Sequence, residues 1–209
     1  NGADLTSGDS YRFGDLLLES SVYNNEEYCE YNGNWYMVEP IRWRLDYTSS
    51  QTSGFSTTTD TLAIMDTIVF VSQFSETELN VGDGYSDTAV TGLLESFAKT
   101  AYFVTETKSM PTFGSTTING TAESVTSNIF VASREEITEV AGNGKIQFSD
   151  LVKDYLIENG QLPLYYTRDL GKNYNNIFCM NGNGESVQYK PQNYFGVQFS
   201  VLITEYACV

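Results

Sequence analysis

The sequence predicts a single α+β domain built on a mixed antiparallel sheet, with two or three helices in the middle of the chain and long polar loops. Alternating or aromatic-rich segments near both ends indicate strands, while apolar residues at helical spacing are confined to the middle. No change in composition divides the 209 residues, and 41% of them are hydrophobic, enough for one core. We expect residues 1–10 to form a flexible tail and residues 11–209 to form the domain.

Strands are expected in the first part of the domain. Residues 34–47 alternate in polarity, which predicts a half-buried strand with Trp35, Met37 and Glu39 on its apolar side. The Asn-Gly pair just before this strand favours a tight turn that pairs it with residues 26–31. The remaining segments of this part are a strand over 61–70 and polar loops over 48–60 and 72–86.

Three segments in the middle of the chain carry the signals of helices. Apolar residues from Val90 to Ala101 recur at helical spacing. Ser133 and Glu136 form a capping box, in which each side chain can bind the backbone N–H of the other. The predicted helices are residues 86–101, capped by Ser86 or Asp87; a short helix after the capping box; and residues 149–159, ended by Gly160.

The C-terminal part changes to short strands rich in Tyr and Phe. The run 181-NGNG-184 favours a hairpin, because Asn and Gly tolerate positive φ. A polar stretch is expected over residues 105–124. The predicted strands that follow it are 127–133, 162–168, 176–181, 185–190 and 195–206.

The charge of the chain argues against two classes of partner. Its formal net charge is −16 and its 11 Lys and Arg residues are scattered, so phosphate backbones and anionic lipid headgroups would be repelled. No apolar run reaches the about 18 residues that cross a bilayer. We expect neither nucleic-acid binding nor membrane insertion. Few Lys residues and abundant Ser, Thr, Asn and Tyr favour a secreted or surface-displayed protein.

The absence of histidine removes the commonest general base and the commonest metal ligand. The three cysteines, Cys29, Cys179 and Cys208, lie far apart and form no C-x-x-C pair, so a zinc site or a redox motif is not expected. With no catalytic signature in the chain, we predict no catalytic residues and no metal ligands, and a binding module is favoured over an enzyme.

Four stretches of the chain resemble a family of secreted and cell-surface bacterial domains of unknown function. The most specific is 31-YNGNWYMVEPIRWRL-45, which is similar to the family's Tyr-x-x-x-x-Tyr-x-Val-Glu-Pro-Ile-x-Trp-Arg-Val strand. The others are 128-NIFVASREEI-137, similar to Lys-Val-Phe-Leu-Leu-Ser-x-x-Glu-Val; 165-YYTRD-169, similar to Trp-Leu-Arg-Ser; and 195-FGVQFSVLI-203, similar to Gly-Val-Arg-Pro-Ala-Leu. The resemblance covers roughly residues 10–205.

That family is similar in turn to the C-type-lectin-like and formylglycine-generating-enzyme-like folds. The resemblance implies that the terminal strands pair and that a variable second half forms a ligand surface. It also makes a disulfide between Cys29 and Cys208, near the two ends, conceivable, with buried free thiols as the alternative. Cys179 alternates with Ile177 and is expected in the core.

Glu39 is the most unusual residue of the predicted apolar strand faces. A buried carboxylate without a partner would be destabilising by several kcal/mol, so it needs an opposite charge. We expect Arg168 to supply that charge, because a bidentate arginine–carboxylate pair satisfies both groups. The interpretation is a structural ion pair between Glu39 and Arg168, with a general acid as the alternative.

A ligand site is predicted on loops of the second half. Tyr174, Asn175, Asn193 and Tyr194 offer flat apolar faces beside amides, as carbohydrate- and protein-binding surfaces do. The segments 83-DGYSD-87 and 181-NGNGE-185 have oxygen ligands at alternate positions, so a bound calcium ion is conceivable, although neither is an EF-hand loop and no cofactor is expected.

The sequence therefore favours a secreted or surface-anchored bacterial module for binding or adhesion, with a carbohydrate or a protein as its ligand. One alternative is a carbohydrate-active enzyme that uses a pair of carboxylates, an acid–base chemistry that needs no histidine. Another is a structural module within a larger surface protein.

Overall fold

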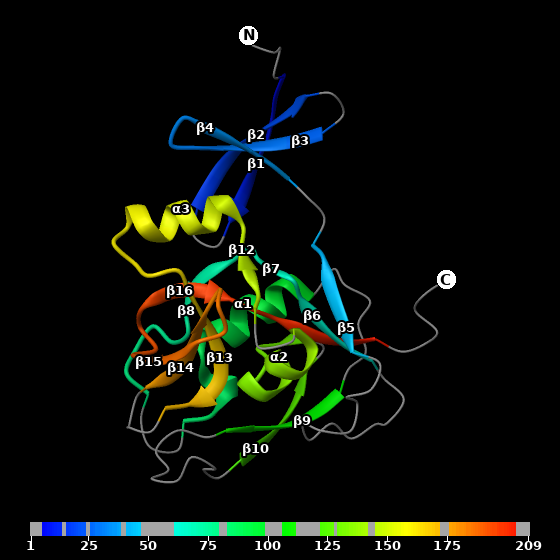
Figure 1. Ribbon diagram of the computed structural model, residues 1–209, viewed down its shortest axis with the longest axis vertical. Helices are drawn as coiled ribbons and strands as arrows, with labels where there is room; N and C mark the ends of the chain where they lie inside the picture. Colours follow the sequence, from blue (N-terminus) through cyan, green and yellow to red (C-terminus); the bar gives the residue numbers. More distant parts are fainter. Residues whose placement is uncertain are drawn as a thin grey trace.

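The computed structural model describes residues 6–13, 16–23, 26–38, 41–46, 61–79, 83–98, 106–111, 122–127, 129–141, 145–171 and 176–203. Within these residues the protein has an α+β fold with three α-helices and several sheets, most of them antiparallel (Figure 1). The predicted α+β class is confirmed. The helices are α1 (Ala89–Ala98), α2 (Arg134–Ala141) and α3 (Asp150–Glu158), with a short 3₁₀ helix, η1 (Tyr85–Asp87), before α1.

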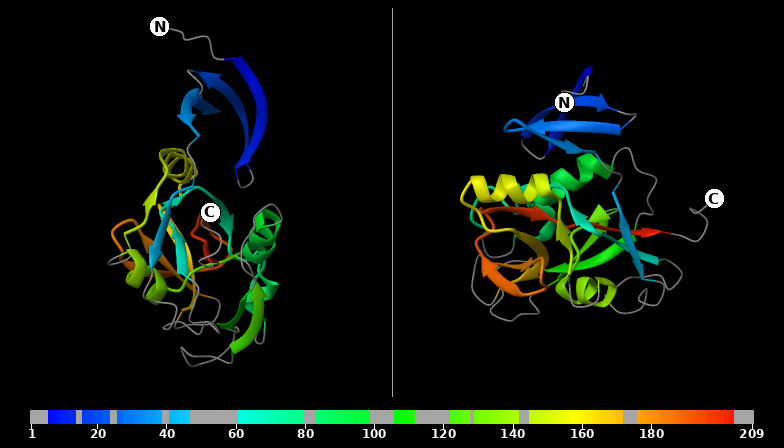
Figure 2. Two further views of the ribbon diagram at one scale, coloured as in Figure 1. Left: turned by 90° about the vertical axis from the view of Figure 1, so that its right-hand side faces the viewer. Right: turned by 45° about the horizontal axis from the view of Figure 1, so that its top comes forward.

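The N-terminal sheet is a four-stranded antiparallel meander that lies at one end of the molecule (Figure 2). Its strands, in spatial order, are β1 (Thr6–Phe13), β2 (Leu16–Tyr23), β3 (Glu26–Tyr31) and β4 (Asn34–Met37). The expected turn between β3 and β4 is confirmed, with φ of 54° at Asn32 and 78° at Gly33. The expected tail over residues 1–10 needs correction, because β1 begins at Thr6 and pairs with β2.

Two further sheets make up the body of the protein, one with four strands and one with five. The first has the order β11-β17-β6-β5, and the second has the order β15-β14-β13-β16-β8. The strands of the first are β5 (Trp43–Asp46), β6 (Thr61–Met65), β11 (Ile129–Phe130) and β17 (Ser200–Ile203). Those of the second are β8 (Val71–Gln73), β13 (Leu164–Leu170), β14 (Ile177–Asn181), β15 (Ser186–Tyr189) and β16 (Tyr194–Val197).

Two small two-stranded sheets complete the described strands. In one, β7 (Thr67–Ile68) pairs in parallel with β12 (Gln147–Phe148). In the other, β9 (Glu106–Pro111) pairs with β10 (Ala122–Ser127), so the stretch 105–124, which was expected to be polar and irregular, carries strands. Ser, Thr and Glu dominate these two strands, and their sequence therefore lacks the alternation of a half-buried strand.

Three segments that were expected as single strands are divided between sheets. Residues 61–70 give β6, which pairs with β5 and β17, and β7, which pairs with β12. Residues 34–47 give β4, which belongs to the N-terminal sheet, and β5, which pairs with β6 in the body. Residues 195–206 give β16 and β17, which lie in different sheets on either side of Gln198. The hairpin expected at 181–184 is confirmed by the pairing of β14 with β15.

All three helices form where the sequence predicted them. The capping box of α2 is present, because Ser133 N–H donates to Glu136 Oε2 at 2.7 Å and Glu136 N–H donates to Ser133 Oγ at 3.2 Å. Ser149 caps α3 through Val152 N–H at 3.3 Å. The start of α1 differs from the expectation: its cap is Thr88, whose Oγ1 accepts Thr91 N–H, because Ser86 and Asp87 belong to η1.

A buried ion pair links α2 to the five-stranded sheet. On β13, Arg168 donates from Nη2 to Glu136 Oε1 at 2.6 Å and from Nη1 to Glu136 Oε2. The same Nη1 donates to the Val131 carbonyl at 3.2 Å, and the guanidinium carbon lies 5.7 Å from the centre of the Phe130 ring. Burial opposes the charge on Arg168, but the adjacent Glu136 carboxylate outweighs it, so the pKa of Arg168 is raised.

The structure thus gives Arg168 a carboxylate partner from α2. Glu39 lies outside the described residues, so its pairing with Arg168 stays a prediction. Tyr85 extends the buried network from η1: its hydroxyl oxygen accepts Val131 N–H at 2.9 Å. Burial raises the pKa of Tyr85 to about 12. The network therefore ties η1, β11, α2 and β13 together beneath the surface.

Removal of the negative charge of this pair should be strongly destabilising. Glu136→Gln can still form the capping box but leaves Arg168 buried with its charge uncompensated, and we expect a loss of about 3–5 kcal/mol in the free energy of unfolding. The measurement is urea denaturation followed by circular dichroism. Glu135→Gln, on the exposed face of the same helical turn, is the matched control and should change the free energy by less than about 0.5 kcal/mol. Equal effects of the two substitutions would contradict a buried pair.

Replacement by alanine should lower the stability of the protein at one glycine and raise it at another. At Gly196 in β16, an added Cβ would meet Ile68 Cγ2 at 2.5 Å and Phe148 Cε1 at 3.0 Å, and overpacking of this kind is destabilising by about 1–3 kcal/mol. At Gly92, exposed in α1, an added Cβ would meet no atom within 4 Å beyond the backbone of its own helix, so Gly92→Ala should stabilise the protein by about 0.4–1 kcal/mol. Thermal unfolding of both variants tests this. A stabilising Gly196→Ala would show that β16 does not pack closely against these side chains.

Candidate binding face on the N-terminal sheet

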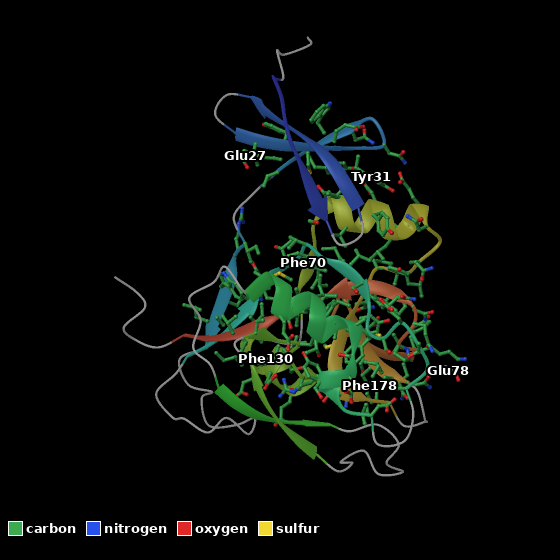
Figure 3. All side chains as sticks on the ribbon, turned by 180° about the vertical axis from the view of Figure 1, so that it is seen from behind. Glu27, Tyr31, Phe70, Glu78, Phe130 and Phe178 are labelled. Carbon is green, nitrogen blue, oxygen red and sulfur yellow. The ribbon has the colours of Figure 1, made fainter. Side chains whose placement is uncertain are left out.

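One face of the N-terminal sheet is docked on α3. Cys29 on β3 is buried against Leu151 of α3 in a small apolar cluster that is separate from the main core. Tyr31, two residues along β3, points toward the same helix (Figure 3), and its ring lies 6.0 Å from that of Tyr155 in an edge-to-face arrangement. The side chains at alternate positions of β3 therefore fix this sheet to α3.

Polar contacts complete the docking. The Tyr36 hydroxyl on β4 donates to Asp154 Oδ2 at 2.8 Å, and Asn32 Nδ2 in the turn donates to Glu158 Oε2 at 2.8 Å. Reduced solvation and the hydrogen bond to Asp154 raise the pKa of Tyr36 to about 12. The hydroxyl is therefore neutral and able to donate at physiological pH.

The opposite face of the sheet exposes large apolar side chains. Because side chains alternate along a strand, Tyr28 and Glu30 project away from α3, and the register places Met37 opposite Tyr28 and Trp35 opposite Glu30. We call these four residues the outer face. Trp35 is 40% exposed and Met37 is 46% exposed, while Tyr28 and Glu30 are half-buried.

The outer face combines flat apolar surface with a fixed carboxylate. Glu30 Oε1 accepts the Gly33 N–H, which holds the carboxylate beside the turn that joins β3 to β4. Trp35 has only two side-chain torsions, so it can present a large contact area without a large entropy loss on binding. Trp and Met are enriched in protein interfaces, and Trp is prominent among the residues that dominate binding energy. The arrangement is chemically suited to ligand binding.

The sequence placed Trp35 and Met37 on the wrong side of their strand. They were expected to face the interior, but the residue that contacts α3 is Tyr36, which lies between them and points to the opposite face of the strand. The Asn-Gly turn fixed which residues of β3 and β4 pair, but not which face of the hairpin would be covered. The docking partner, α3, lies more than a hundred residues away along the chain, and no local signal reveals it.

Of the residues predicted to bind ligand, Asn193 and Tyr194 lie where the chain turns from β15 into β16. The Asn193 carbonyl accepts the Tyr166 hydroxyl at 2.6 Å, and Tyr194 is half-buried against the main core. The carbonyl of Pro191, in the same turn, accepts Phe74 N–H at 2.8 Å. This turn is therefore anchored to the body. Tyr174 and Asn175 lie outside the described residues, so their part of the predicted site stays a prediction.

The two acidic and amide-rich segments use oxygens within their own turns. Asp87 Oδ2 accepts Gly84 N–H at 2.9 Å. Asn181 Oδ1 accepts Asn183 N–H at 2.9 Å and Glu185 N–H at 3.0 Å. Among the described residues, no group of three or more His, Cys, Asp or Glu side chains is placed to hold a metal ion. A calcium site stays a prediction.

The described cysteines, Cys29 and Cys179, are both buried, and no disulfide joins them. Cys29 lies in the contact with α3 and Cys179 lies in the main core, as expected. Burial raises the pKa of each thiol. Cys208 lies outside the described residues, so a disulfide with Cys29 stays a prediction.

No protein-family model matches the chain, and no curated protein or solved structure matches it significantly. Among the described residues, no helix is both long enough and apolar enough to cross a membrane.

The contact between the N-terminal sheet and α3 should weaken at alkaline pH. The raised pKa of Tyr36 means that folding favours the neutral hydroxyl, so its contribution is complete below about pH 10 and is lost as the pH rises towards about 12. Hydrogen exchange of residues 26–37 should therefore accelerate over this interval relative to residues 164–170. Tyr36→Phe should accelerate exchange at neutral pH and reduce the pH dependence. Unchanged exchange in Tyr36→Phe would show that this hydrogen bond does not hold the sheet.

Proposed function

We propose that the protein is a secreted or cell-surface bacterial module for binding or adhesion, which takes a carbohydrate or protein ligand on its outer face. The observation that carries this proposal is the exposure of Trp35 and Met37, side by side, on a sheet whose other face is docked on α3. A C-type-lectin-like outline and a relation to the bacterial surface-domain family are part of the same proposal. They are supported by the α+β class and by the four sequence stretches that resemble the family.

Energetics favour a binding role for this face. Apolar surface removed from water contributes about 25 cal/mol per Å², so an exposed Trp beside an exposed Met offers a large gain to any ligand that covers them. The face is already ordered, because β3 and β4 are joined by a two-residue turn and fixed to α3. Binding would therefore require little further loss of conformational entropy.

The location at the cell exterior rests on composition. The chain has 27 acidic and 11 basic residues, many hydroxyl and amide side chains, and three cysteines. A strongly acidic surface keeps a displayed domain soluble and limits non-specific contacts with anionic polymers.

The proposal is tested by screening the purified protein on a glycan array, with and without calcium, and against a phage-displayed peptide library. Any ligand should bind Trp35→Ala at least about tenfold more weakly than the unaltered protein, as expected for a central interface residue. Val187→Ala is the matched control, since Val187 is 41% exposed on β15, and it should leave binding unchanged. Ligands that bind both variants equally, or the absence of any ligand in both screens, would contradict the proposal.

A further inference from the structure

We propose that the edge of β4 that no described strand covers binds an extended, Lys- or Arg-bearing segment of another protein, which adds to the N-terminal sheet as a fifth, antiparallel strand. This inference rests on the proposed function, because it names the class of ligand that the outer face would take.

The first support is the position of β4 in its sheet. β4 is the last strand in the order β1-β2-β3-β4, and among the described strands it pairs with β3 alone. In a hairpin closed by a two-residue turn, the residues that flank the turn, here Tyr31 and Asn34, exchange backbone hydrogen bonds. Along β4, every second residue directs its backbone N–H and C=O groups toward β3, and the pattern continues to Val38, whose N–H donates to the Glu27 carbonyl at 2.7 Å. Even-numbered residues of this segment thus direct their backbone groups toward β3.

It follows that Trp35 and Met37 direct their backbone N–H and C=O groups toward the open edge. These are the same two residues whose side chains are exposed on the outer face. A segment added along β4 would form backbone hydrogen bonds with both residues, and its alternate side chains would lie beside their side chains. Trp35 and Met37 can therefore bind the added segment through both their backbone and their side chains.

The second support is that the sequence of β4 carries no charge that would oppose pairing with another chain. Proteins commonly place charged side chains on exposed edges, and these prevent pairing with other chains. Among the other edge strands of the three larger sheets, the sequences of β1 and β5 contain charged residues, whereas those of β8, β11 and β15 contain none. The sequence of β4, Asn-Trp-Tyr-Met, has no charge.

The third support is the sign of the charge in the sequence around β3 and β4, which selects the partner. Between Arg12 and Arg42 the chain has no Lys or Arg but six acidic residues: Asp15, Glu19, Glu26, Glu27, Glu30 and Glu39. A cationic side chain laid over the Trp35 indole would gain a cation–π contact beside the Glu30 carboxylate. A second copy of this chain would instead bring a net charge of −16 against an equal one.

The test uses a fluorescent, end-capped octapeptide of alternating Lys and Thr, with binding measured by anisotropy. The peptide should bind the unaltered protein and Val187→Ala equally, and should bind Trp35→Ala at least about tenfold more weakly. Replacement of every Lys by Glu should weaken binding by at least the same factor.

Backbone methylation tests strand addition directly. In an antiparallel addition, the peptide residues opposite Trp35 and Met37 direct their own backbone groups toward β4. With Lys at those positions, beside Trp35, N-methylation of the Lys amides should abolish binding, and N-methylation of the Thr amides should leave it within about threefold. Equal binding by the two methylated peptides would overturn the inference, and so would equal binding by the Lys and Glu peptides.

Two further outcomes separate this inference from the proposed function. If a glycan from the array binds in a Trp35-dependent manner and the Lys–Thr peptide does not bind, the inference fails and the proposed function stands. If neither screen yields a ligand and the peptide does not bind, both fail. Concentration-dependent dimerisation of the unaltered protein in analytical ultracentrifugation, abolished by Met37→Lys, would assign the edge to a second copy and overturn the inference.

Discussion

The ion pair between Arg168 and Glu136 is the contact on which the body of the protein depends. It joins the second helix to the longest strand of the five-stranded sheet, and Arg168 also reaches the backbone at Val131. Two charges removed from water are tolerated only when each finds its partner, so this pair permits few arrangements of the surrounding elements. Glu136 meets a second requirement at the same time, because it also caps the start of α2. One carboxylate thus fixes both where the helix begins and where it packs.

The N-terminal sheet is attached in a different way. Its contact with α3 consists of one small apolar cluster, an aromatic pair and two hydrogen bonds between a neutral donor and a carboxylate. Contacts of this kind are individually worth about 1 kcal/mol, much less than a buried core. The sheet is therefore ordered by its own strand pairing and oriented by α3, which leaves its other face available to solvent.

Local signals in the sequence were sufficient for the helices and turns and insufficient for the sheets. Ser133 with Glu136, Ser149 at the start of α3, and Asn32 with Gly33 act within a few residues, so the sequence alone predicted those elements. The partner of Arg168 was not predictable in this way, because it is chosen by the packing of α2 on β13. Strands β1 and β9 were missed since Ser, Thr and acidic residues give them no apolar alternation. The candidate binding face was missed because the sequence does not say which side of a hairpin α3 will cover.

The division of residues 34–47 between two sheets has a mechanical consequence. The chain leaves the N-terminal sheet after β4 and enters the body at β5, so the covalent link between them runs from Val38 to Trp43. If the protein is held through the body, a tensile force applied to a ligand at β4 would reach the body through this link and through the contact with α3. The sheet could then yield under load while the body stays folded, a property that suits an adhesive module attached to a larger surface.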